Sequence, residues 1–291
     1  MFASSGHSAE LADSRGIQTF DTPPERVIAL SWSIAELLIK LDVDPVGITD
    51  MAGYRTWVVQ PELPETAVEI GLRNEPNLER IAELDPDLII ISDEQDMLIP
   101  RLERIAPVAH FESFNAGQDN YAVSRDTYLR LGALWGKDDL AQERLDALDA
   151  QVKAAGERVA QHFADVPPPV APIRLLTPTT ARLHSTNSMA KAALDGMGLQ
   201  HAAPGTSSDW GFRQLSVEDL AQFDAAIVLQ IDPFAQPGDL FASPMWQFMP
   251  FVQAGHFAVS RPVWTFGSAF SVGYMADAFA DALTTLDPKG P

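Results

Sequence analysis

The sequence contains no cysteine, few basic residues for its acidic ones, and no long hydrophobic run. Without cysteine the chain has no disulfide, no thiolate zinc site and no cysteine nucleophile. No apolar run approaches the roughly 18 residues that mark a membrane-spanning helix. There are 20 Lys and Arg against 40 Asp and Glu, which gives a formal net charge of −20 at pH 7. Such a charge excludes nucleic acid and anionic membrane surfaces as direct partners and favours a partner with a basic face.

The familiar signatures of enzyme chemistry are also missing. The sequence has neither the G-x-S-x-G of a nucleophile elbow nor the G-x-G-x-x-G of a dinucleotide fold. Residues 132–138 (GALWGKD) superficially resemble a phosphate-binding loop, but the motif is one residue short and ends in Asp. The 6 histidines never pair at helical spacing, so the sequence indicates no metal site. An α/β enzyme with a cleft site is the alternative from a different functional class.

The length and the apolar content predict two domains. A chain of 291 residues corresponds to about two domains of roughly 150 residues each, and 46% hydrophobic residues suffice for two cores. Strand, helix and strand alternate in the first part, and the strands are continuously apolar, which is typical of a parallel sheet covered on both faces. We expect strands at 26–30, 46–48 and 88–92, and helices at 34–41 and 78–84, the second capped by Asn77.

A second stretch repeats part of this pattern. Residues 77–91 (NLERIAELDPDLIII) match residues 216–230 (SVEDLAQFDAAIVLQ) at a constant offset of 139 residues, with Glu79 aligned to Glu218. Each copy has a capping residue, an acidic first turn, an amphipathic helix, an Asp turn and a buried strand. All αβ units share such features, and three identities are weak alone. Their placement at the same point of each half predicts two similarly built lobes.

The stretch between the two halves predicts one long helix. Apolar residues recur at spacings of three and four along residues 138–164, and three consecutive prolines at 167–169 forbid continuation. A helix of about 25 residues is about 38 Å long. The predicted fold is therefore α/β, with two Rossmann-like lobes, 1–137 and 165–291, that contain parallel-rich sheets and are joined by a rigid helix at 138–164.

Three aromatic clusters lie in segments predicted as loops, at 54–57 (YRTW), 209–212 (DWGF) and 263–267 (VWTFG). Arg73 lies in the loop before the first repeated helix, and Trp210 lies in the corresponding loop of the second half. Ligands of α/β sheets bind at the carboxyl ends of strands, where such loops gather. Either each Trp packs against its own lobe, or these residues line a site. Trp offers rigid apolar area and Arg offers a fork of donors for oxygens.

Four segments carry a resemblance to a known family: 54–64, 71–79, 244–255 and 263–267. With these segments, and from Arg26 to the C-terminus, the sequence resembles the periplasmic ferric-hydroxamate siderophore-binding proteins of ABC iron importers, within the class III periplasmic binding proteins with a helical backbone. The resemblance implies a shallow cleft between two lobes, capture of a ferric siderophore and delivery to an inner-membrane ABC permease dimer. It also implies a monomer without catalytic residues, working in the periplasm as a mature form whose signal sequence is absent from this chain.

The resemblance also implies which residues meet the ligand. Arg73 would bond hydroxamate oxygens, and Phe266 stands where the family has an aromatic residue with a hydroxyl. The siderophore itself saturates the iron, so no cofactor and no metal-ligating side chain is expected. The predicted ligand-binding set is Tyr54, Trp57, Arg73, Gln95, Trp210, Trp264 and Phe266.

One loop departs from the family pattern. After the strand at 88–92 the family places a tyrosine that contacts the hydroxamate, whereas this chain has residues 93–97 (DEQDM). The acidic loop is either simply solvated, or its carboxylates favour a siderophore that carries a free amine. The natural siderophore stays open. Another bulky chelate, haem or a corrinoid, is the alternative within binding proteins, and the combination of one Arg with three Trp argues against it.

The repeated glutamates have two readings. The resemblance implies that one surface glutamate of each lobe, Glu79 and Glu218, docks onto arginines of the permease dimer. The structural alternative is compensation of the helix dipole in the first turn, worth about 0.3–1 kcal/mol each.

Overall fold

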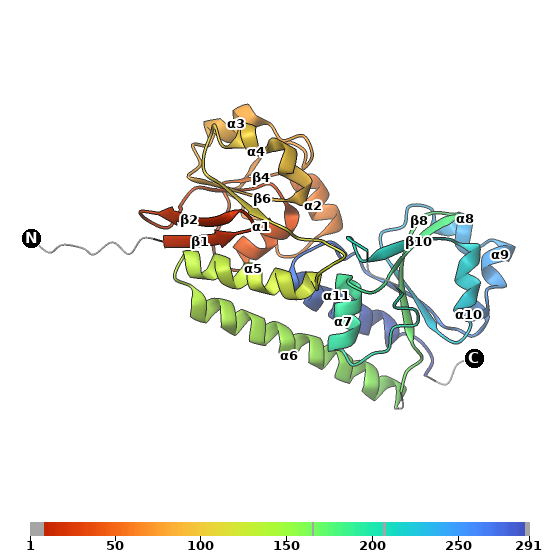
Figure 1. The fold of residues 1–291 in the computed structure, drawn as a ribbon. Coiled ribbons are helices and arrows are strands. Elements are labelled where there is room, and N and C mark those ends of the chain that lie inside the picture. The colour runs from red at the N-terminus through yellow and green to blue at the C-terminus, as the bar shows by residue number, and fades with distance from the viewer. Residues whose placement is uncertain (1–8, 165, 206–207, 289–291) are drawn as a thin grey trace, which may run out of the picture. The chain divides into compact units, whose positions relative to one another are not determined.

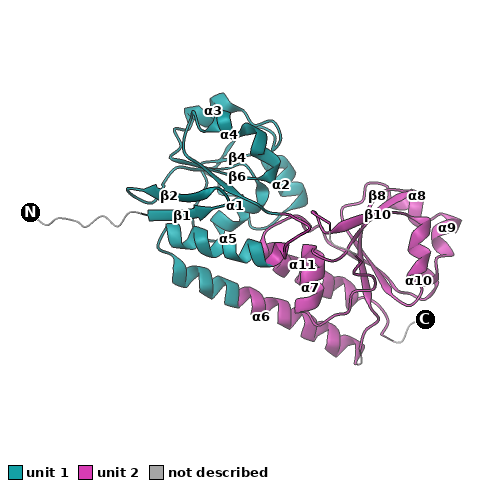
Figure 2. Ribbon diagram, viewed as in Figure 1, with its two compact units in different colours: residues 1–113, 122–146 teal, residues 114–121, 147–291 magenta. Residues whose placement is uncertain are grey.

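The computed structural model describes residues 9–164, 166–205 and 208–288. The chain divides into two compact units, coloured separately in Figure 2. Unit 1 consists of residues 1–113 and 122–146, and unit 2 consists of residues 114–121 and 147–291. The short segment 114–121 therefore groups with unit 2, although residues 122–146, which follow it in the sequence, belong to unit 1.

One long helix is shared by the two units. Helix α6 spans Asp138–Phe163, with residues 138–146 in unit 1 and residues 147–163 in unit 2 (Figures 1 and 2). The apolar residues that predicted it are buried along its length, among them Leu145, Val152 and Val159. The predictions of two α/β lobes and of a long helix joining them are confirmed.

Unit 1 is built on a sheet of five parallel strands in the order β5-β4-β3-β6-β7. These strands are β3 (Val27–Ala29), β4 (Gly47–Ile48), β5 (Val68–Glu69), β6 (Leu88–Ser92) and β7 (Val108–Phe111). The helices of the unit are α1 (Trp32–Ile39), α2 (Met51–Trp57), α3 (Leu78–Glu83), the 3₁₀ helix η1 (Asp93–Leu98), α4 (Ile99–Leu102) and most of α5 (Asn120–Leu134).

The core of unit 1 explains the continuously apolar strands. Every residue of β6 is buried, so both faces of the sheet are covered, as parallel sheets require. Ile28 and Ile89 pack in one cluster with Ile81 of α3 and Leu102 of α4. The prediction of a parallel sheet in this half is confirmed.

A hairpin precedes this sheet that the sequence did not predict. Strands β1 (Ala9–Asp13) and β2 (Gly16–Phe20) pair antiparallel across a tight turn (Figure 1). Asp13 accepts a hydrogen bond from the backbone nitrogen of His110 at 3.0 Å, which ties the hairpin to β7. Most of its residues are exposed or half-buried, so the segment carried little of the apolar pattern that predicts a strand.

Unit 2 is built on a mixed sheet in the order β10-β9-β8-β11-β12. Strands β8, β11 and β12 run parallel, and β9 is antiparallel to both of its neighbours. The strands are β8 (Val170–Thr177), β9 (Thr180–His184), β10 (Phe212–Ser216), β11 (Ile227–Ile231) and β12 (Phe257–Ser260). The helices are α7 (Met189–Gly196), the 3₁₀ helix η2 (Glu218–Gln222), α8 (Pro237–Phe241), α9 (Pro244–Gln247), α10 (Pro250–Gln253) and α11 (Ala269–Leu283).

The internal repeat is a structural repeat. Strands β6 and β11 keep the offset of 139 residues at both ends, and each is the fourth strand of its sheet. The same capping bond precedes them: Asn77 Oδ1 accepts from the Arg80 nitrogen at 3.0 Å, and Ser216 Oγ accepts from the Asp219 nitrogen at 3.2 Å. The second copy differs in one respect, because the predicted amphipathic helix is only the short 3₁₀ helix η2.

Two segments predicted as loops are helical. Residues 54–57 form the end of α2, whose start is capped by Asp50 through a hydrogen bond from the Gly53 nitrogen at 3.1 Å. Residues 93–97 lie in η1, which Ser92 and Gln95 close with a capping box. Both segments are too short for a helical period to stand out, and both caps depend on side-chain geometry that the residue pattern alone does not reveal.

Within residues 9–164, 166–205 and 208–288, every helix is too short or too polar to cross a membrane.

Candidate functional site

In unit 1, Arg73 is held on an aromatic ring. Its guanidinium carbon lies 4.0 Å from the centroid of the Trp32 ring. Trp32 is 3% exposed, and its indole Nε1 donates to the carbonyl oxygen of Thr49 at 3.0 Å. Tyr54 meets Trp32 edge to face, with ring centroids 6.2 Å apart. The ring on which Arg73 rests is therefore fixed by the unit's core.

Two further contacts hold the same arginine. Arg73 Nη1 lies 3.2 Å from Glu94 Oε2. Gln95 Nε2 donates to the carbonyl oxygen of Arg73 at 3.2 Å, and Gln95 Oε1 accepts from the Ser92 nitrogen at 3.1 Å. A pocket of about 450 Å³ opens here, and its lining residues are Asp50, Leu72, Arg73, Asn74 and Glu94.

The contributing residues share a place in the fold. Trp32 follows β3, Thr49 follows β4 and Glu94 follows β6, three neighbouring parallel strands. Their carboxyl ends meet at one edge of the sheet, where α/β folds bind ligands. A guanidinium on a ring keeps its N–H donors in a defined plane, so this edge can bind a group with several acceptor oxygens.

Three other predicted residues of unit 1 differ in exposure. Tyr54 is 1% exposed and its hydroxyl donates to the carbonyl oxygen of Pro61 at 3.0 Å, while Gln95 is fully buried. Both therefore support Trp32 and Arg73 from within the core. Trp57, the last residue of α2, is half-buried and keeps part of its ring at the surface.

In unit 2 the aromatic residues form one cluster around Phe266. Its ring centroid lies 5.5 Å from those of Trp210 and Trp264, 5.8 Å from that of Phe212 and 6.2 Å from that of Phe114. Phe114 and Trp210 are stacked, with centroids 5.1 Å apart and planes inclined by 23°. Trp210 is 37% exposed, so the cluster presents an apolar face to solvent. The structure thus brings together Trp210, Trp264 and Phe266.

The loop that carries Trp210 has little freedom. Gly211 has a φ of +67°, and a Cβ at this position would lie 2.5 Å from the Cα of Ser188, so only glycine fits. Asn120 Nδ2 donates to the carbonyl oxygens of Asp209 and Asn187, at 3.1 and 3.0 Å. These bonds tie the segment of Phe114 to the loop of Trp210 and fix the stacked pair.

Three polar residues of the sheet lie beneath this cluster. Arg174, 4% exposed, donates from Nη2 to the carbonyl oxygen of Val263 at 2.8 Å and so anchors the loop of Trp264. The guanidinium carbon of Arg182 lies 4.4 Å from the Phe212 ring centroid. His184 is fully buried, and desolvation lowers its pKa to about 3, with Arg174 and Arg182 acting in the same direction. The imidazole is therefore neutral at physiological pH.

The acidic loop of unit 1 is only partly available to a ligand. His110 Nε2 lies 2.9 Å from Asp96 Oδ1 and 3.6 Å from Asp93 Oδ1, and Asp93 Oδ2 accepts from the Ser113 nitrogen at 2.9 Å. Of the three carboxylates, Glu94 is the one that lines the pocket beside Arg73. The hypothesis that carboxylates of this loop favour a siderophore with a free amine therefore concerns Glu94.

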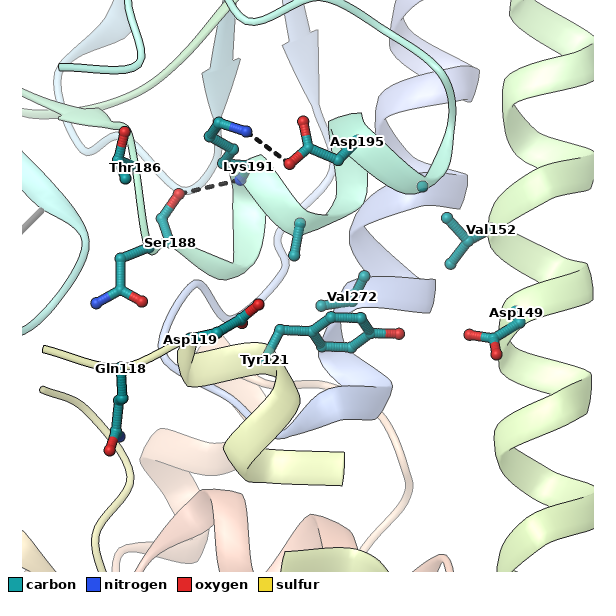
Figure 3. A pocket seen from close by; sticks show the side chains of 13 residues that line it. Gln118, Asp119, Tyr121, Asp149, Val152, Thr186, Ser188, Lys191, Asp195 and Val272 are labelled. Carbon is teal, nitrogen blue, oxygen red and sulfur yellow. Dashed lines mark hydrogen bonds and ion pairs between the residues drawn. The ribbon is translucent and has the colours of Figure 1, made fainter. Parts of the chain in front are cut away.

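A larger pocket, of about 660 Å³, lies in unit 2 around the start of α7. In Figure 3, Lys191 points toward Asp195, and Tyr121 points toward Asp149. Lys191 Nζ lies 2.6 Å from Asp195 Oδ2, and its backbone nitrogen donates to Ser188 Oγ at 3.0 Å. The lysine charge is thus already paired, and the pocket is unlike the aromatic surface of the same unit. Among the described residues, no group of three His, Cys, Asp or Glu side chains could hold a metal ion.

The two repeated glutamates are both at the surface. Glu79 lies in the first turn of α3, and Glu218 begins η2. Both residues are exposed. Their side chains are available to a partner, each on its own unit.

Several residues of these sites were not predicted from the sequence. Trp32 and Phe114 each follow a strand, and a search for aromatic residues directly after strands would have found them. Arg174 interrupts the otherwise apolar first part of β8, which is itself a signal because a charged residue seldom lies within a buried strand. Arg182 gives no such signal, because β9 also contains Thr180 and His184. Glu94 was recognised as part of the acidic loop, but its pairing with Arg73 was not.

Comparison with known proteins gives consistent matches. The family model described as periplasmic binding protein matches residues 27–263. The iron(3+)-hydroxamate-binding protein FhuD of Escherichia coli is 30% identical over 262 residues, which cover 89% of this chain and 87% of that protein. The Fe(3+)-citrate-binding protein YfmC of Bacillus subtilis is 27% identical over 267 residues, covering 89% and 80%. The crystal structure of the Fe3+-Desferal-bound siderophore-binding protein FhuD from Vibrio cholerae superposes with a TM-score of 0.87 at 36% identity, covering 89% of this chain and 98% of that one.

The contacts of His110 predict a pH-dependent contribution to stability. The nearby carboxylate of Asp93 raises the pKa of His110, and the charge of Asp96 adds to this against the opposing effect of burial. Because the folded state binds the proton more tightly, this contribution is complete below the unfolded pKa of about 6.5 and is lost as the pH rises through the folded pKa.

We therefore expect His110→Asn to lower the free energy of unfolding more at pH 6 than at pH 8, measured by urea denaturation. Asp96→Asn, which removes a carboxylate but keeps the imidazole, should reduce the difference between the two pH values. An equal loss at both pH values would show that the charge of His110 does not contribute.

Proposed function

The chain belongs to the periplasmic binding protein family, and on this premise we propose that it captures a ferric hydroxamate siderophore outside the cytoplasm and delivers it to an ABC transporter. Its relatives are substrate-binding transport proteins rather than enzymes. One observation carries the proposal: the guanidinium of Arg73 lies over the ring of Trp32, where it can donate to the oxygens of such a ligand. Localisation in the periplasm is part of this proposal.

The chemistry of the ligand explains why the protein needs no metal-binding side chains. In a ferric trihydroxamate six hydroxamate oxygens already coordinate the iron, so the metal has no vacant position. The outer surface of the complex consists of partly negative oxygens and an apolar chain. A binding protein therefore needs hydrogen-bond donors and apolar area.

In unit 1, Arg73 supplies the donors. Its guanidinium lies over Trp32 and Gln95 holds its backbone, so little conformational entropy is lost when a ligand binds. Glu94 forms an ion pair with this guanidinium, and both side chains are partly exposed. Hydroxamate oxygens replace this weak ion pair at small cost.

In unit 2, the aromatic cluster supplies the apolar area. Trp210 and Trp264 meet Phe266 edge to face, an arrangement that fixes ring positions while leaving ring surface exposed. We assign Trp57 of unit 1 the same role. Tyr54 and Gln95 act indirectly, because their buried side chains position Trp32 and Arg73.

The proposed partner is the inner-membrane permease dimer. Glu79 and Glu218 occupy equivalent places in the two units, and both are exposed. A permease of two similar subunits would present a basic residue to each of them. The net charge of −20 favours such an encounter with a basic surface.

Titration of intrinsic tryptophan fluorescence tests the proposed ligand. Ferric hydroxamates should quench the fluorescence at micromolar concentration, whereas the iron-free siderophores and haem should not. Arg73→Met should weaken binding by roughly tenfold to a hundredfold, because it removes charged hydrogen-bond donors. Arg101→Met, at an exposed position of α4, should bind as the wild type does. If no ferric hydroxamate changed the fluorescence while haem or a corrinoid did, the ligand class would be wrong.

The same titrations test whether Glu94 affects the choice of siderophore. Ferrioxamine B carries a free ammonium group and ferrichrome does not. Once a ligand has taken Arg73, Glu94 is free to pair with a cation. Glu94→Gln should therefore lower the affinity for ferrioxamine B relative to ferrichrome by up to about fivefold, the range of an exposed ion pair. Asp96→Asn should leave the ratio unchanged because Asp96 contacts His110. An unchanged ratio in Glu94→Gln would contradict this role.

Charge reversal tests the docking role. The double variant Glu79→Arg and Glu218→Arg should bind the ferric siderophore normally but lose transporter-dependent uptake of the labelled complex by cells. The matched control reverses Glu83 and Asp224, which are exposed neighbours of the two glutamates, and should transport normally. Unimpaired uptake by the Glu79 and Glu218 variant would contradict docking.

A further inference from the structure

Arg182 lies on the aromatic face of the sheet in unit 2. The strand register places it opposite Arg174 of β8 and Gln214 of β10. Residues opposite one another across a sheet share a face, and so do residues two apart along a strand. Arg182 therefore shares its face with His184, which pairs with Phe212, and lies beneath the cluster around Phe266.

The guanidinium of Arg182 stacks on this cluster. Its central carbon lies 4.4 Å from the ring centroid of Phe212 and 5.8 Å from that of Phe266. The residue is half-buried, so part of it reaches the surface. The contact repeats in unit 2 what Trp32 does for Arg73 in unit 1, where the carbon-to-centroid distance is 4.0 Å.

Among the residues that the structure describes, none accepts a hydrogen bond from the guanidinium of Arg182. Its Nε is buried without a hydrogen-bond partner among the described residues. In that same part of the chain, no carboxylate forms an ion pair with Arg182. Burial lowers its pKa, as expected of a cation that has lost water without gaining an anion. An unsatisfied guanidinium is costly, and an acceptor from outside the chain would offset that cost.

The ring beside Arg182 has no polar group of its own. Phe266 stands at the centre of the cluster, and a phenylalanine ring offers a ligand no hydrogen-bond donor. The guanidinium carbon of Arg182 lies 5.8 Å from the centroid of that ring. An oxygen-rich ligand on the cluster would therefore find its donors at Arg182.

We propose that Arg182 is a second ligand-binding guanidinium, which donates hydrogen bonds to siderophore oxygens at the aromatic cluster of unit 2. The inference rests on the proposed function and adds a named contact to it. Arg182 would then do in unit 2 what Arg73 does in unit 1, and each of the two guanidinium groups lies over an aromatic ring of its own unit.

The test compares variants by titration with ferrioxamine B and by thermal unfolding. Arg182→Met keeps the apolar stem and removes the donors, and it should weaken binding by at least about tenfold, the loss of a charged hydrogen bond. Arg182→Lys keeps the charge but not the planar fork, and its affinity should lie between those of Arg182→Met and the wild type. The control is Arg213→Met. Arg213 is exposed, and it pairs with Leu183 from the adjacent strand β10, on the other face of the sheet.

A second substitution separates ligand binding from a structural role. Phe266→Tyr places a hydroxyl on the neighbouring ring, and in the Arg182→Met background it should recover part of the lost affinity. If Arg182 had only a structural role, Arg182→Met would lower the melting temperature and Phe266→Tyr would restore no affinity.

The outcomes are distinct for the two proposals. If the wild type failed to bind any ferric hydroxamate, the proposed function would fall. Normal wild-type binding with unchanged affinity in Arg182→Met would overturn only the role of Arg182.

Discussion

A guanidinium that lies over an aromatic ring is the contact on which the candidate sites of both units depend. Arg73 lies over Trp32 in unit 1, and Arg182 lies over Phe212 in unit 2. A long arginine side chain normally has many rotamers, and stacking removes most of that freedom before a ligand arrives. Much of the remaining structure serves this end: Thr49 and Tyr54 fix Trp32, and Gln95 fixes the backbone of Arg73.

The two units reach these arrangements by related routes. Strands β6 and β11 occupy the same position in their sheets, and a side-chain cap precedes each of them at the same offset. The sheets then diverge, because β9 and β10 run antiparallel in unit 2. Arg182 lies in the middle of β9, whereas Arg73 lies in a loop. One unit therefore presents its cation from a loop above the strand ends, and the other presents it from the sheet.

Much of this could be predicted from the sequence. The period of apolar residues in 138–164 predicted α6, and continuous apolar runs predicted β3 and β6, because burial of whole faces leaves a direct trace in the sequence. The importance of Arg73 was inferred from its place before a repeated helix and from family resemblance. Trp32, Phe114 and Arg182 were missed because their roles depend on which strand ends and loops meet in space.

Two features of the local structure could not be predicted from the pattern of residues. The turns at 54–57 and 93–97 are helical because Asp50 and Gln95 cap them, and a cap depends on backbone geometry rather than on apolar period. From the sequence, the three carboxylates of the acidic loop were treated as equivalent. In the structure His110 lies beside Asp93 and Asp96, whereas Glu94 lies beside Arg73. A residue's neighbours in the fold thus decide what an acidic run can do.

The proposed function requires that the protein binds an intact ferric siderophore through the siderophore's own surface. Equilibrium dialysis against ferrioxamine B, with iron and chelator measured separately in the protein compartment, tests this most directly. Iron and chelator should be retained together, at one of each per chain, and ferric iron supplied without a hydroxamate should not be retained. Retention of iron without the chelator, or of neither, would contradict it.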